Sequence, residues 1–405
     1  MPYAFQLPTT STLSFETFLS STIHPSLPFV ATTYRGVLRN VLKEHKRLSI
    51  QAKASNIKNV LSTLNEYLPY ILALGAGLSG TSVADEEVDV ILQTEVEVEW
   101  RTCLTASMPG REAPRVKGKG LDYEICFALH TLACTYTLFA RAQLHMIYTT
   151  TTLTDEQRMG FITMATKHLL HANSIHNYLM SRNEDVGATS VVVETLPSVQ
   201  GGLAALALAE ATLLAVLKDD PYPSVIAQDR SKDNKEWMIK APEIPKVRAT
   251  LFARLCLAAA DHAEKAEAML KSPDAGRSGQ IDDSLMKYVH DLKKTSKAKA
   301  CRFFGMGVES NGETGQGIAW LVGAKKTLGF GGTQDETSKY KGLTKLKKDW
   351  TEKREDKKIE KGKDWGGDAG RLEEARIIEM LENKWNKMND TVMDSLVFQV
   401  VRHNL

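Results

Sequence analysis

The sequence predicts a mainly α-helical protein that forms one elongated domain over residues 1–405, with a small β element in its N-terminal third. Apolar residues recur at intervals of three and four along most of the chain, which is the spacing of one helix face. Period-two alternation is strong in one place, where Val96, Val98 and Trp100 alternate with charged residues. Polar connections divide the helical segments into pairs of about 30 to 45 residues, so we expect stacked helical hairpins of the tetratricopeptide (TPR-like) type.

In the first third of the chain, a helical region is predicted first and the β element follows it. Apolar spacing predicts helix from Val37 to Leu74, either as two helices or as one helix that is interrupted near Ser49. A strand is expected within 95–104 because of the alternation described above. The polar segment 107–120, SMPGREAPRVKGKG, is expected to be a loop or the far end of a β-hairpin.

The rest of the chain predicts a series of long helices. Thr154 and Gln157 form a capping box, in which each side chain hydrogen-bonds to the backbone of the other residue at a helix start. The two most apolar helices, 124–148 and 202–217, are expected in the centre of the helical layer. The other helices are expected at about 154–180 and 247–270, from about 283, from about 315, and over 372–385.

Two polar segments interrupt this series. Residues 219–245 are rich in Pro and Asp and predict a loop that is long for a packed domain. Within it, Tyr222, Pro223 and Val225 are typical of a turn, and they also match a Y-P-x-L-type docking peptide with Val at the last position. Residues 339–363 contain eleven Lys or Arg and five Asp or Glu, so we expect a basic insertion or an exposed helix there.

Composition excludes several classes of protein. Lys and Arg total 51 and Asp and Glu total 49, which argues against a nucleic-acid-binding protein with a general excess of positive charge. Five scattered cysteines exclude a disulfide scaffold and fit a reducing compartment. The N-terminal residues lack the pattern of a secretory signal, and the most apolar run, Leu203 to Leu217, is short for a bilayer and contains Glu210. We therefore expect a cytoplasmic protein.

No motif indicates catalysis or a cofactor. His168, His171 and His176 share part of a helix face, but they lack Cys, Asp or Glu companions and are more typical of packed or surface residues than of metal ligands. The segment Gly329 to Thr333, GFGGT, lacks the lysine and the spacing of a phosphate-binding loop. We predict no catalytic residue, metal, cofactor or small-molecule substrate. An enzyme with an unrecognised site is the remaining alternative.

Five segments, in order along the chain, resemble the Bro-one (Bro1) domain of Alix and its relatives. They are LDYEICFALHTLACTYTLFA at 121–140, LPSVQGGLAALALAEATLL at 196–214, VRATLFARLCLAAADHAEKA at 247–266, GQGIAWLVGAKKTL at 315–328 and KMNDTVMDSLVFQVV at 387–401. Within that family, the N-terminus and the string GIAWLVGAKKTLGF resemble most a fungal branch that acts in ambient alkaline pH signalling. The resemblance implies a boomerang-shaped helical fold.

The resemblance also implies a function. Bro1 domains are non-enzymatic adaptors that bind the C-terminal amphipathic helix of the Snf/CHMP filament subunit of ESCRT-III, and they are recruited from the cytoplasm to the periphery of endosomes or the plasma membrane. Aligned on Glu210, one position of the family's apolar patch falls at Thr212, next to Leu213 and Leu214. Aligned on the A-R-L motif within Phe252 to Leu255, the other two positions fall at Leu251 and Leu255 on the following helix. The two leucines keep the i, i+4 spacing that a bound helix requires. The alternative is a helical scaffold that acts mainly by binding an anionic membrane surface through its shape and basic residues.

Overall fold

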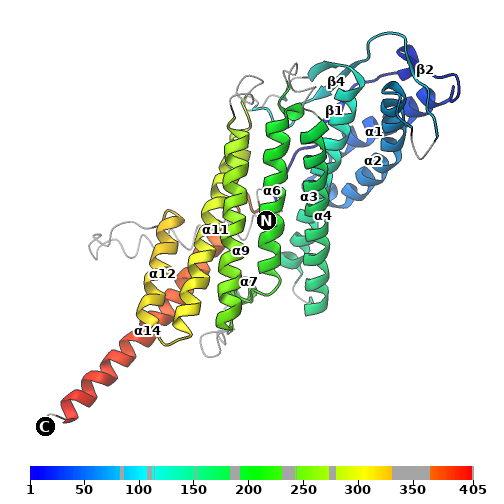
Figure 1. Ribbon diagram of the computed structural model, residues 1–405. Coiled ribbons are helices and arrows are strands. Elements are labelled where there is room, and N and C mark those ends of the chain that lie inside the picture. The colour runs from blue at the N-terminus through cyan, green and yellow to red at the C-terminus, as the bar shows by residue number, and fades with distance from the viewer. Residues whose placement is uncertain are drawn as a thin grey trace.

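The computed structural model describes the chain from Met1 to residue 403, and it leaves out several internal segments. These are 83–85, 107–111, 114, 151–152, 183–191, 230–241, 243, 273–279 and 331–364, and only the backbone is described at 226–229 and 391–403. The predicted basic insertion at 339–363 therefore lies outside the described residues. The described part is mainly helical, as the sequence predicts (Figure 1).

Two antiparallel helices begin the fold, α1 (Leu27–Arg47) and α2 (Ile50–Leu78). The break between them falls at Leu48 and Ser49, which confirms the first of the two alternatives. The Ser49 hydroxyl accepts a hydrogen bond from the Ala52 backbone N–H, so this serine is the N-cap of α2.

Two small sheets lie beside these helices. The larger has the antiparallel strand order β1–β4–β5, and the smaller pairs β2 with β3; the strands are β1 (Thr9–Thr10), β2 (Leu19–Ser20), β3 (Ile91–Leu92), β4 (Glu97–Arg101) and β5 (Arg115–Lys119). Val98 and Trp100 are buried, as their alternation predicts. The predicted strand is shorter than 95–104. The second half of 107–120 is the return strand of a hairpin rather than a loop.

In the rest of the chain, the residues that the structure describes form seven long helices and one short helix, α7, which lies between two of them. The long ones are α3 (Leu121–Thr149), α4 (Asp155–Arg182), α6 (Pro197–Leu217), α9 (Lys246–Leu270), α11 (Asp283–Glu309), α12 (Thr314–Thr327) and α14 (Arg371–His403). From α3 to α12 each long helix packs against the next, so the chain builds a layer of stacked hairpins. Thr154 and Gln157 form both hydrogen bonds of the predicted capping box.

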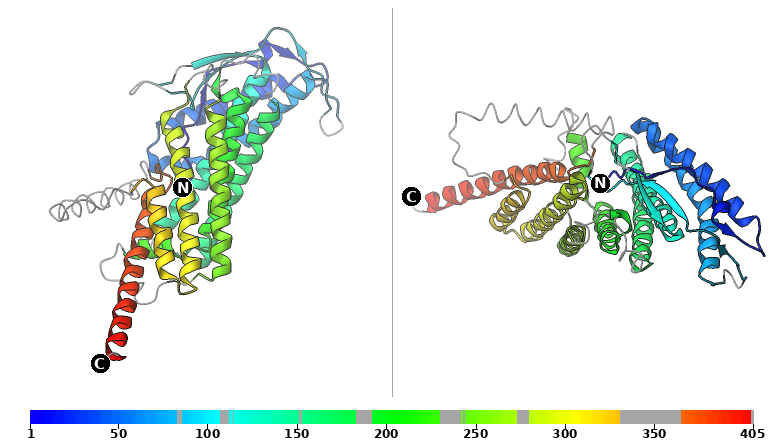
Figure 2. Two further views of the ribbon diagram at one scale, coloured as in Figure 1. Left: turned by 60° about the vertical axis from the view of Figure 1, so that its left-hand side comes forward. Right: turned by 90° about the horizontal axis from the view of Figure 1, so that it is seen from above.

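The layer is curved and elongated. Viewed from above, the helices follow an arc, with α1 and α2 at one end and α12 and α14 at the other (Figure 2). α3 and α6 are long and apolar enough to cross a membrane by composition, but most of each apolar window is buried against neighbouring helices. This burial is typical of central core helices and confirms their predicted position.

A buried carboxylate ties the N-terminal helices and the sheet to α3. Glu124 accepts hydrogen bonds from Arg35 on α1 at 2.8 and 3.1 Å, from the Tyr67 hydroxyl on α2 at 2.8 Å, and from the Trp100 indole on β4 at 2.7 Å. The four side chains are fully or almost fully buried. One carboxylate of α3 is thus joined to α1, α2 and β4. We call α1, α2 and the two sheets together the N-terminal arm.

A second buried ion network joins the other end of the layer. The Arg302 guanidinium on α11 binds Glu374 on α14 at 2.6 Å and Asp220, which follows α6, at 2.6 Å. Lys299 adds a second cationic group, 2.8 Å from Glu374. These contacts hold the first turns of α14 against α11, while the C-terminal part of α14 extends beyond the layer (Figure 1).

The segment 219–245 contains structure that the sequence did not predict. α7 (Tyr222–Asp229) occupies its first part, and Tyr222 and Val225 are buried in the same apolar cluster as Phe252 and Phe303. A docking peptide must expose these side chains to a partner, so the docking-peptide alternative is wrong. The prolines here start a helix, where a missing backbone N–H costs little.

Candidate functional site

The predicted partner-binding residues lie on two neighbouring antiparallel helices, α6 and α9 (Figure 1). The register of this pair is visible at Gly202, where an added Cβ would lie 2.9 Å from Leu270 and 3.4 Å from the Ala266 carbonyl oxygen. The start of α6 thus lies beside the end of α9. The end of α6, with Thr212, consequently lies beside the start of α9, with Leu251 and Leu255.

An apolar stripe runs along the outer side of α9. Val247 is 83% exposed and Leu251 is 53% exposed, and both lack the cover that large apolar side chains normally have inside a fold. Leu255, one turn further, is half-buried and packs against the cluster that contains Phe252. The spacing of four places all three on one face of the helix. This stripe is the most exposed apolar feature of the predicted site.

The two predicted residues of α6 differ in their surroundings. Thr212 is half-buried, and its hydroxyl donates to the Leu208 carbonyl at 2.8 Å, so its polar group is satisfied within the helix. Leu213 packs against two core clusters, which include Phe252 and Leu206 respectively. Successive residues on a helix point about 100° apart. The structure therefore exposes Leu251, whereas Thr212, Leu213 and Leu255 are half-buried, and Leu213 and Leu255 pack against the same apolar cluster.

A groove of about 580 Å³ lies between α4 and α6, next to this surface. Its apolar lining includes Ile162 and Leu170 from α4 and Leu214 and Ala215 from α6. The α4 residues that line it recur every four positions, at 162, 166, 170 and 174. This periodicity is present in the sequence, but small polar members such as Thr166 and Ser174 conceal it. The groove is therefore not evident from the sequence.

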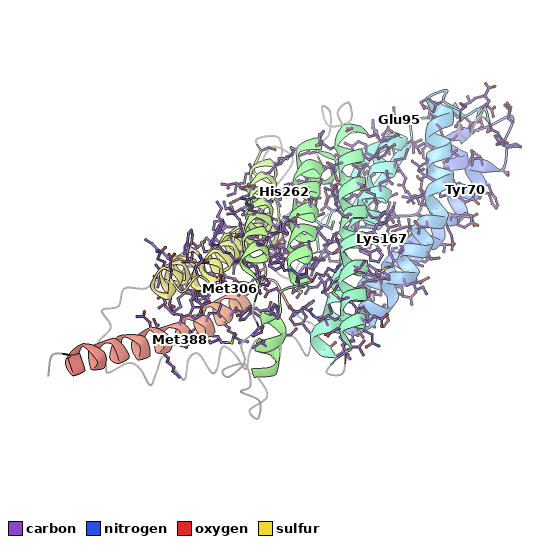
Figure 3. The ribbon with its side chains drawn as sticks, turned by 60° about the horizontal axis from the view of Figure 1, so that its bottom comes forward. Tyr70, Glu95, Lys167, His262, Met306 and Met388 are labelled. Carbon is purple, nitrogen blue, oxygen red and sulfur yellow. The ribbon has the colours of Figure 1, made fainter. Side chains whose placement is uncertain are left out.

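The surface formed by α4, α6 and α9 is basic around its apolar centre. Lys167, Lys218, Arg248 and Arg254 are exposed, and α9 has no acidic residue before Asp261. Figure 3 labels Lys167 on α4 and His262 on α9, which lie on either side of α6. Opposite charges at the rim of an interface guide association and fix its orientation.

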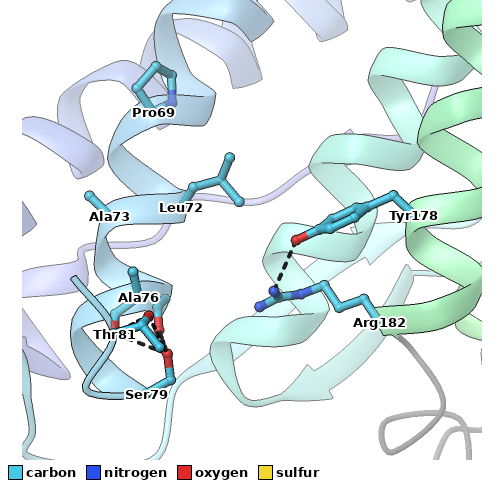
Figure 4. Close-up of a pocket in the computed structure, with 9 residues that line it drawn as sticks. Pro69, Leu72, Ala73, Ala76, Ser79, Thr81, Tyr178 and Arg182 are labelled. Atoms are coloured by element: carbon cyan, nitrogen blue, oxygen red, sulfur yellow. Dashed lines mark hydrogen bonds between the residues drawn. The ribbon is translucent and has the colours of Figure 1, made fainter. Parts of the chain in front are cut away.

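A second groove, of about 480 Å³, separates α2 from α4 (Figure 4). Leu72 and Pro69 line it from α2, and Tyr178 and Arg182 line it from α4. The Arg182 guanidinium binds Asp122 at 2.6 Å and donates to the Tyr178 hydroxyl at 3.3 Å. Its charge is thus already paired, and the groove shows no exposed stripe comparable with that of α9.

The three histidines of α4 do not converge on a metal position. His176 is buried and bonds to Gln200 at 2.7 Å through Nδ1, and burial lowers its pKa to about 3. His168 and His171 both stack against Tyr136, and His171 is exposed and lines the α4–α6 groove. In the described part of the chain, no group of three or more His, Cys, Asp or Glu residues is placed to hold a metal ion.

One buried cluster has the residue types of a reactive site. The His130 imidazole lies 3.5 Å from the Cys134 sulfur and 3.6 Å from the Cys103 sulfur. Burial opposes ionisation of Cys134, but the contacts with Cys103 and His130 prevail and lower its pKa to about 6. Because Cys134 is fully buried, a substrate could reach it only if the fold opened. The sequence shows the i, i+4 pair His130 and Cys134 but not the approach of Cys103.

Comparison with solved structures defines the fold class. No protein-family model matches the chain. The structure reported as the basis for endosomal targeting by the Bro1 domain matches with a TM-score of 0.51 and 15% identity, over 97% of this chain and 87% of that one. The crystal structure of ALIX with the SIVmac239 PYKEVTEDL late domain matches with a TM-score of 0.50 and 16% identity, over 90% of this chain and 45% of that one. The protein therefore has a Bro1-domain fold.

Sequence comparison identifies the family. The pH-response regulator protein palC of Emericella nidulans is 44% identical over 428 aligned positions, which cover 98% of this chain and 84% of that protein. The chain belongs to the palC family of pH-response regulators. The predicted Bro1 resemblance, and its fungal pH-signalling branch, are confirmed.

Proposed function

We propose that this protein is a non-enzymatic, ESCRT-associated adaptor in ambient alkaline pH signalling that binds the C-terminal amphipathic helix of the ESCRT-III Snf/CHMP filament subunit. Membership of the palC family supports the signalling role. The observation that carries the binding role is the exposed stripe of Val247 and Leu251, which continues to the half-buried Leu255. Large apolar side chains exposed in a row on one helix face are typical of an interaction surface.

The geometry suits a helix that presents apolar residues at i, i+3, i+4 and i+7. Burying a leucine-sized side chain contributes about 1.5 to 3 kcal/mol, so each apolar anchor that the stripe accepts raises the affinity by roughly ten- to a hundredfold. The α4–α6 groove offers a further apolar seat next to Thr212. The partner helix would then cross α6, with its acidic flank near Lys218 and Arg254.

The adaptor role requires neither a cofactor nor a catalytic residue. We propose that the protein acts from the cytoplasm and is recruited peripherally to plasma-membrane or endosomal sites through its partner. The membrane-scaffold alternative depends on the shape of the protein and on its basic residues. The most basic segment, 339–363, lies outside the described residues, so this alternative stays a prediction.

Direct titration tests the proposed function. The whole protein is titrated with the C-terminal helical peptide of the filament subunit, and binding in the low micromolar range is expected. The control peptide has the same composition, with its apolar residues moved off the common helix face. Equal binding of both peptides, or binding of neither, would refute the proposal.

A further inference from the structure

A group of cationic side chains gathers on the N-terminal arm, far from the partner-binding surface. Figure 1 shows α1 and β4 at one end of the layer, separated from α9 by α3, α4 and α6. We call this group the α1–β5 basic cluster, and it consists of Arg39, Lys43 and Arg47 on α1, Arg101 on β4 and Arg115 on β5.

The helix contributes three cations from one face. Arg39, Lys43 and Arg47 are spaced four residues apart on α1, so they lie one above the other. Arg39 donates from Nη1 to the Asn40 side chain at 3.0 Å. Its Nε is shielded from solvent and has no hydrogen-bond partner among the residues that the structure describes. Such a donor is costly to leave unpaired.

The sheet contributes two arginines that face each other. Arg101 and Arg115 are directly paired across β4 and β5, an arrangement that destabilises a sheet unless other charges compensate. The nearest carboxylate to Arg115 is that of Glu99, at 3.9 Å. The Arg115 Nη1 is also shielded and has no partner within the described ranges.

The helix and the sheet lie close together here, because Glu112 binds both Lys46 on α1 and Arg101 on β4. Burial, together with the charges of Arg39, Arg115 and Arg47, lowers the pKa of the Lys43 ammonium. Cations from α1 and β5 are thus close enough to repel one another. Glu112 offsets part of this charge, since it binds Arg101 at 2.9 Å, but it is shared with Lys46. Glu99 and Glu112 leave most of the cluster's charge uncompensated.

We propose that the α1–β5 basic cluster binds an anion that carries several phosphate groups. Guanidinium groups bind phosphate oxygens through two parallel N–H donors, and the cluster contains four arginines around one lysine. Such an anion would supply acceptors for the unpaired Arg39 and Arg115 donors and would relieve the repulsion among the cations. The shared chemistry fits two sources, a phosphoinositide headgroup in a membrane and a soluble inositol polyphosphate. The proposal does not depend on the function proposed above.

Binding experiments with two probes separate these sources. The first probe is inositol hexakisphosphate, titrated calorimetrically into the whole protein. The second is phosphatidylcholine vesicles with and without phosphatidylinositol 4,5-bisphosphate, tested by flotation. Binding of the soluble probe alone supports a soluble ligand, and binding of the phosphoinositide vesicles alone supports a headgroup. Binding of neither probe would overturn the proposal.

A pair of matched double variants tests the location. In R39Q/K43Q we expect at least about a tenfold loss of affinity for whichever probe binds. The control K265Q/K287Q removes two exposed lysines from α9 and α11, away from the cluster, and should bind as the parent does. R39Q/K43Q removes repulsion between cations, so we expect its melting temperature not to fall below that of the parent. Measuring this temperature checks that the variant is folded. An equal loss of affinity in both double variants would overturn the proposal.

Discussion

The N-terminal arm and the contact between α6 and α9 are held together by different physical means. In the arm, side chains from α1, α2 and β4 donate hydrogen bonds to one buried carboxylate of α3, Glu124, which needs specific donors at fixed positions. Between α6 and α9 the contact depends on small residues, such as Gly202 against Leu270, that let two helices approach closely. The outer surfaces differ as well, since the arm carries the basic cluster and α9 carries an apolar stripe. We therefore expect the arm to be sensitive to charge and the α6–α9 contact to be sensitive to size.

The largest effect is expected from Arg35→Met in the arm. This variant leaves Glu124 buried without its cation, and breaking a buried pair from one side costs about 3 to 5 kcal/mol of unfolding free energy. Urea denaturation measures the change. Arg39→Met on the same helix is the control, and because Arg39 is partly exposed it should change stability by less than about 1 kcal/mol. Equal losses in both variants would contradict the special role of the Glu124 network.

A pH-dependent effect is expected from Glu210 on α6. Burial raises the pKa of Glu210 to about 7, although Tyr288 and the Tyr3 backbone N–H donate hydrogen bonds to it. In the unfolded chain this carboxyl loses its proton near its ordinary pKa, so the native state loses stability as pH rises between about 4.5 and 7. Glu210→Gln does not titrate and removes this loss. Relative to the parent, E210Q should gain about 3 kcal/mol between pH 5 and pH 8 in urea denaturation. If the unfolding free energies of the two proteins changed in parallel with pH, Glu210 would have its ordinary pKa in the native state, which would contradict this prediction.

A size effect is expected at the α6–α9 contact. Gly202→Val introduces a Cβ into a space that Leu270 already occupies, and overpacking of this kind costs about 1 to 3 kcal/mol. Gly323→Ala on α12 is the matched control, since nothing lies within 4 Å of its added Cβ. A helical Gly→Ala change without a clash should stabilise the protein by about 0.5 to 1 kcal/mol. Thermal unfolding of the two variants should shift in opposite directions.

The smallest effect is expected from salt. Raising the salt from about 50 to 500 mM shortens the screening length several-fold, so phosphate-anion binding at the arm should weaken by more than about tenfold. Binding of the partner helix depends mainly on apolar burial and should weaken by less than about threefold. The same titrations at both salt concentrations measure the difference, and a reversed order would contradict the comparison.

The helices could be predicted from the sequence because their packing leaves a local pattern. Ser49 marks the break between α1 and α2, and Thr154 with Gln157 marks the start of α4, and each signal acts within a few residues. The return strand β5 lacks such a pattern because its inward position opposite Val98 is Gly118, which leaves room for the Tyr123 ring. α7 is concealed by prolines that are tolerated only at a helix start.

The candidate site could be predicted only in part. Alignment to a family assigned the site to Thr212, Leu213, Leu251 and Leu255, but it could not show that Leu251 is exposed while Leu213 and Leu255 pack against the core. Contacts between distant residues leave no local pattern at all. Arg35 meets Glu124 across 89 positions, and the basic cluster depends on a strand register that brings Arg101 opposite Arg115. Such contacts follow from the fold rather than from local periodicity.

The most direct test of the central claim is the comparison of Leu251→Asp with Leu257→Asp. Both leucines lie on α9 and are exposed, at 53% and 40%. Because they are six residues apart, they point about 240° apart around the helix axis and lie on different sides of the helix. Because both are exposed, both variants should melt close to the parent, whereas the half-buried Leu255 would not give so clear a result. The peptide titration should show at least about a tenfold loss of affinity for L251D and parental affinity for L257D. Parental affinity in L251D, or an equal loss in L257D, would contradict the claim that the partner helix lies on the α6–α9 surface.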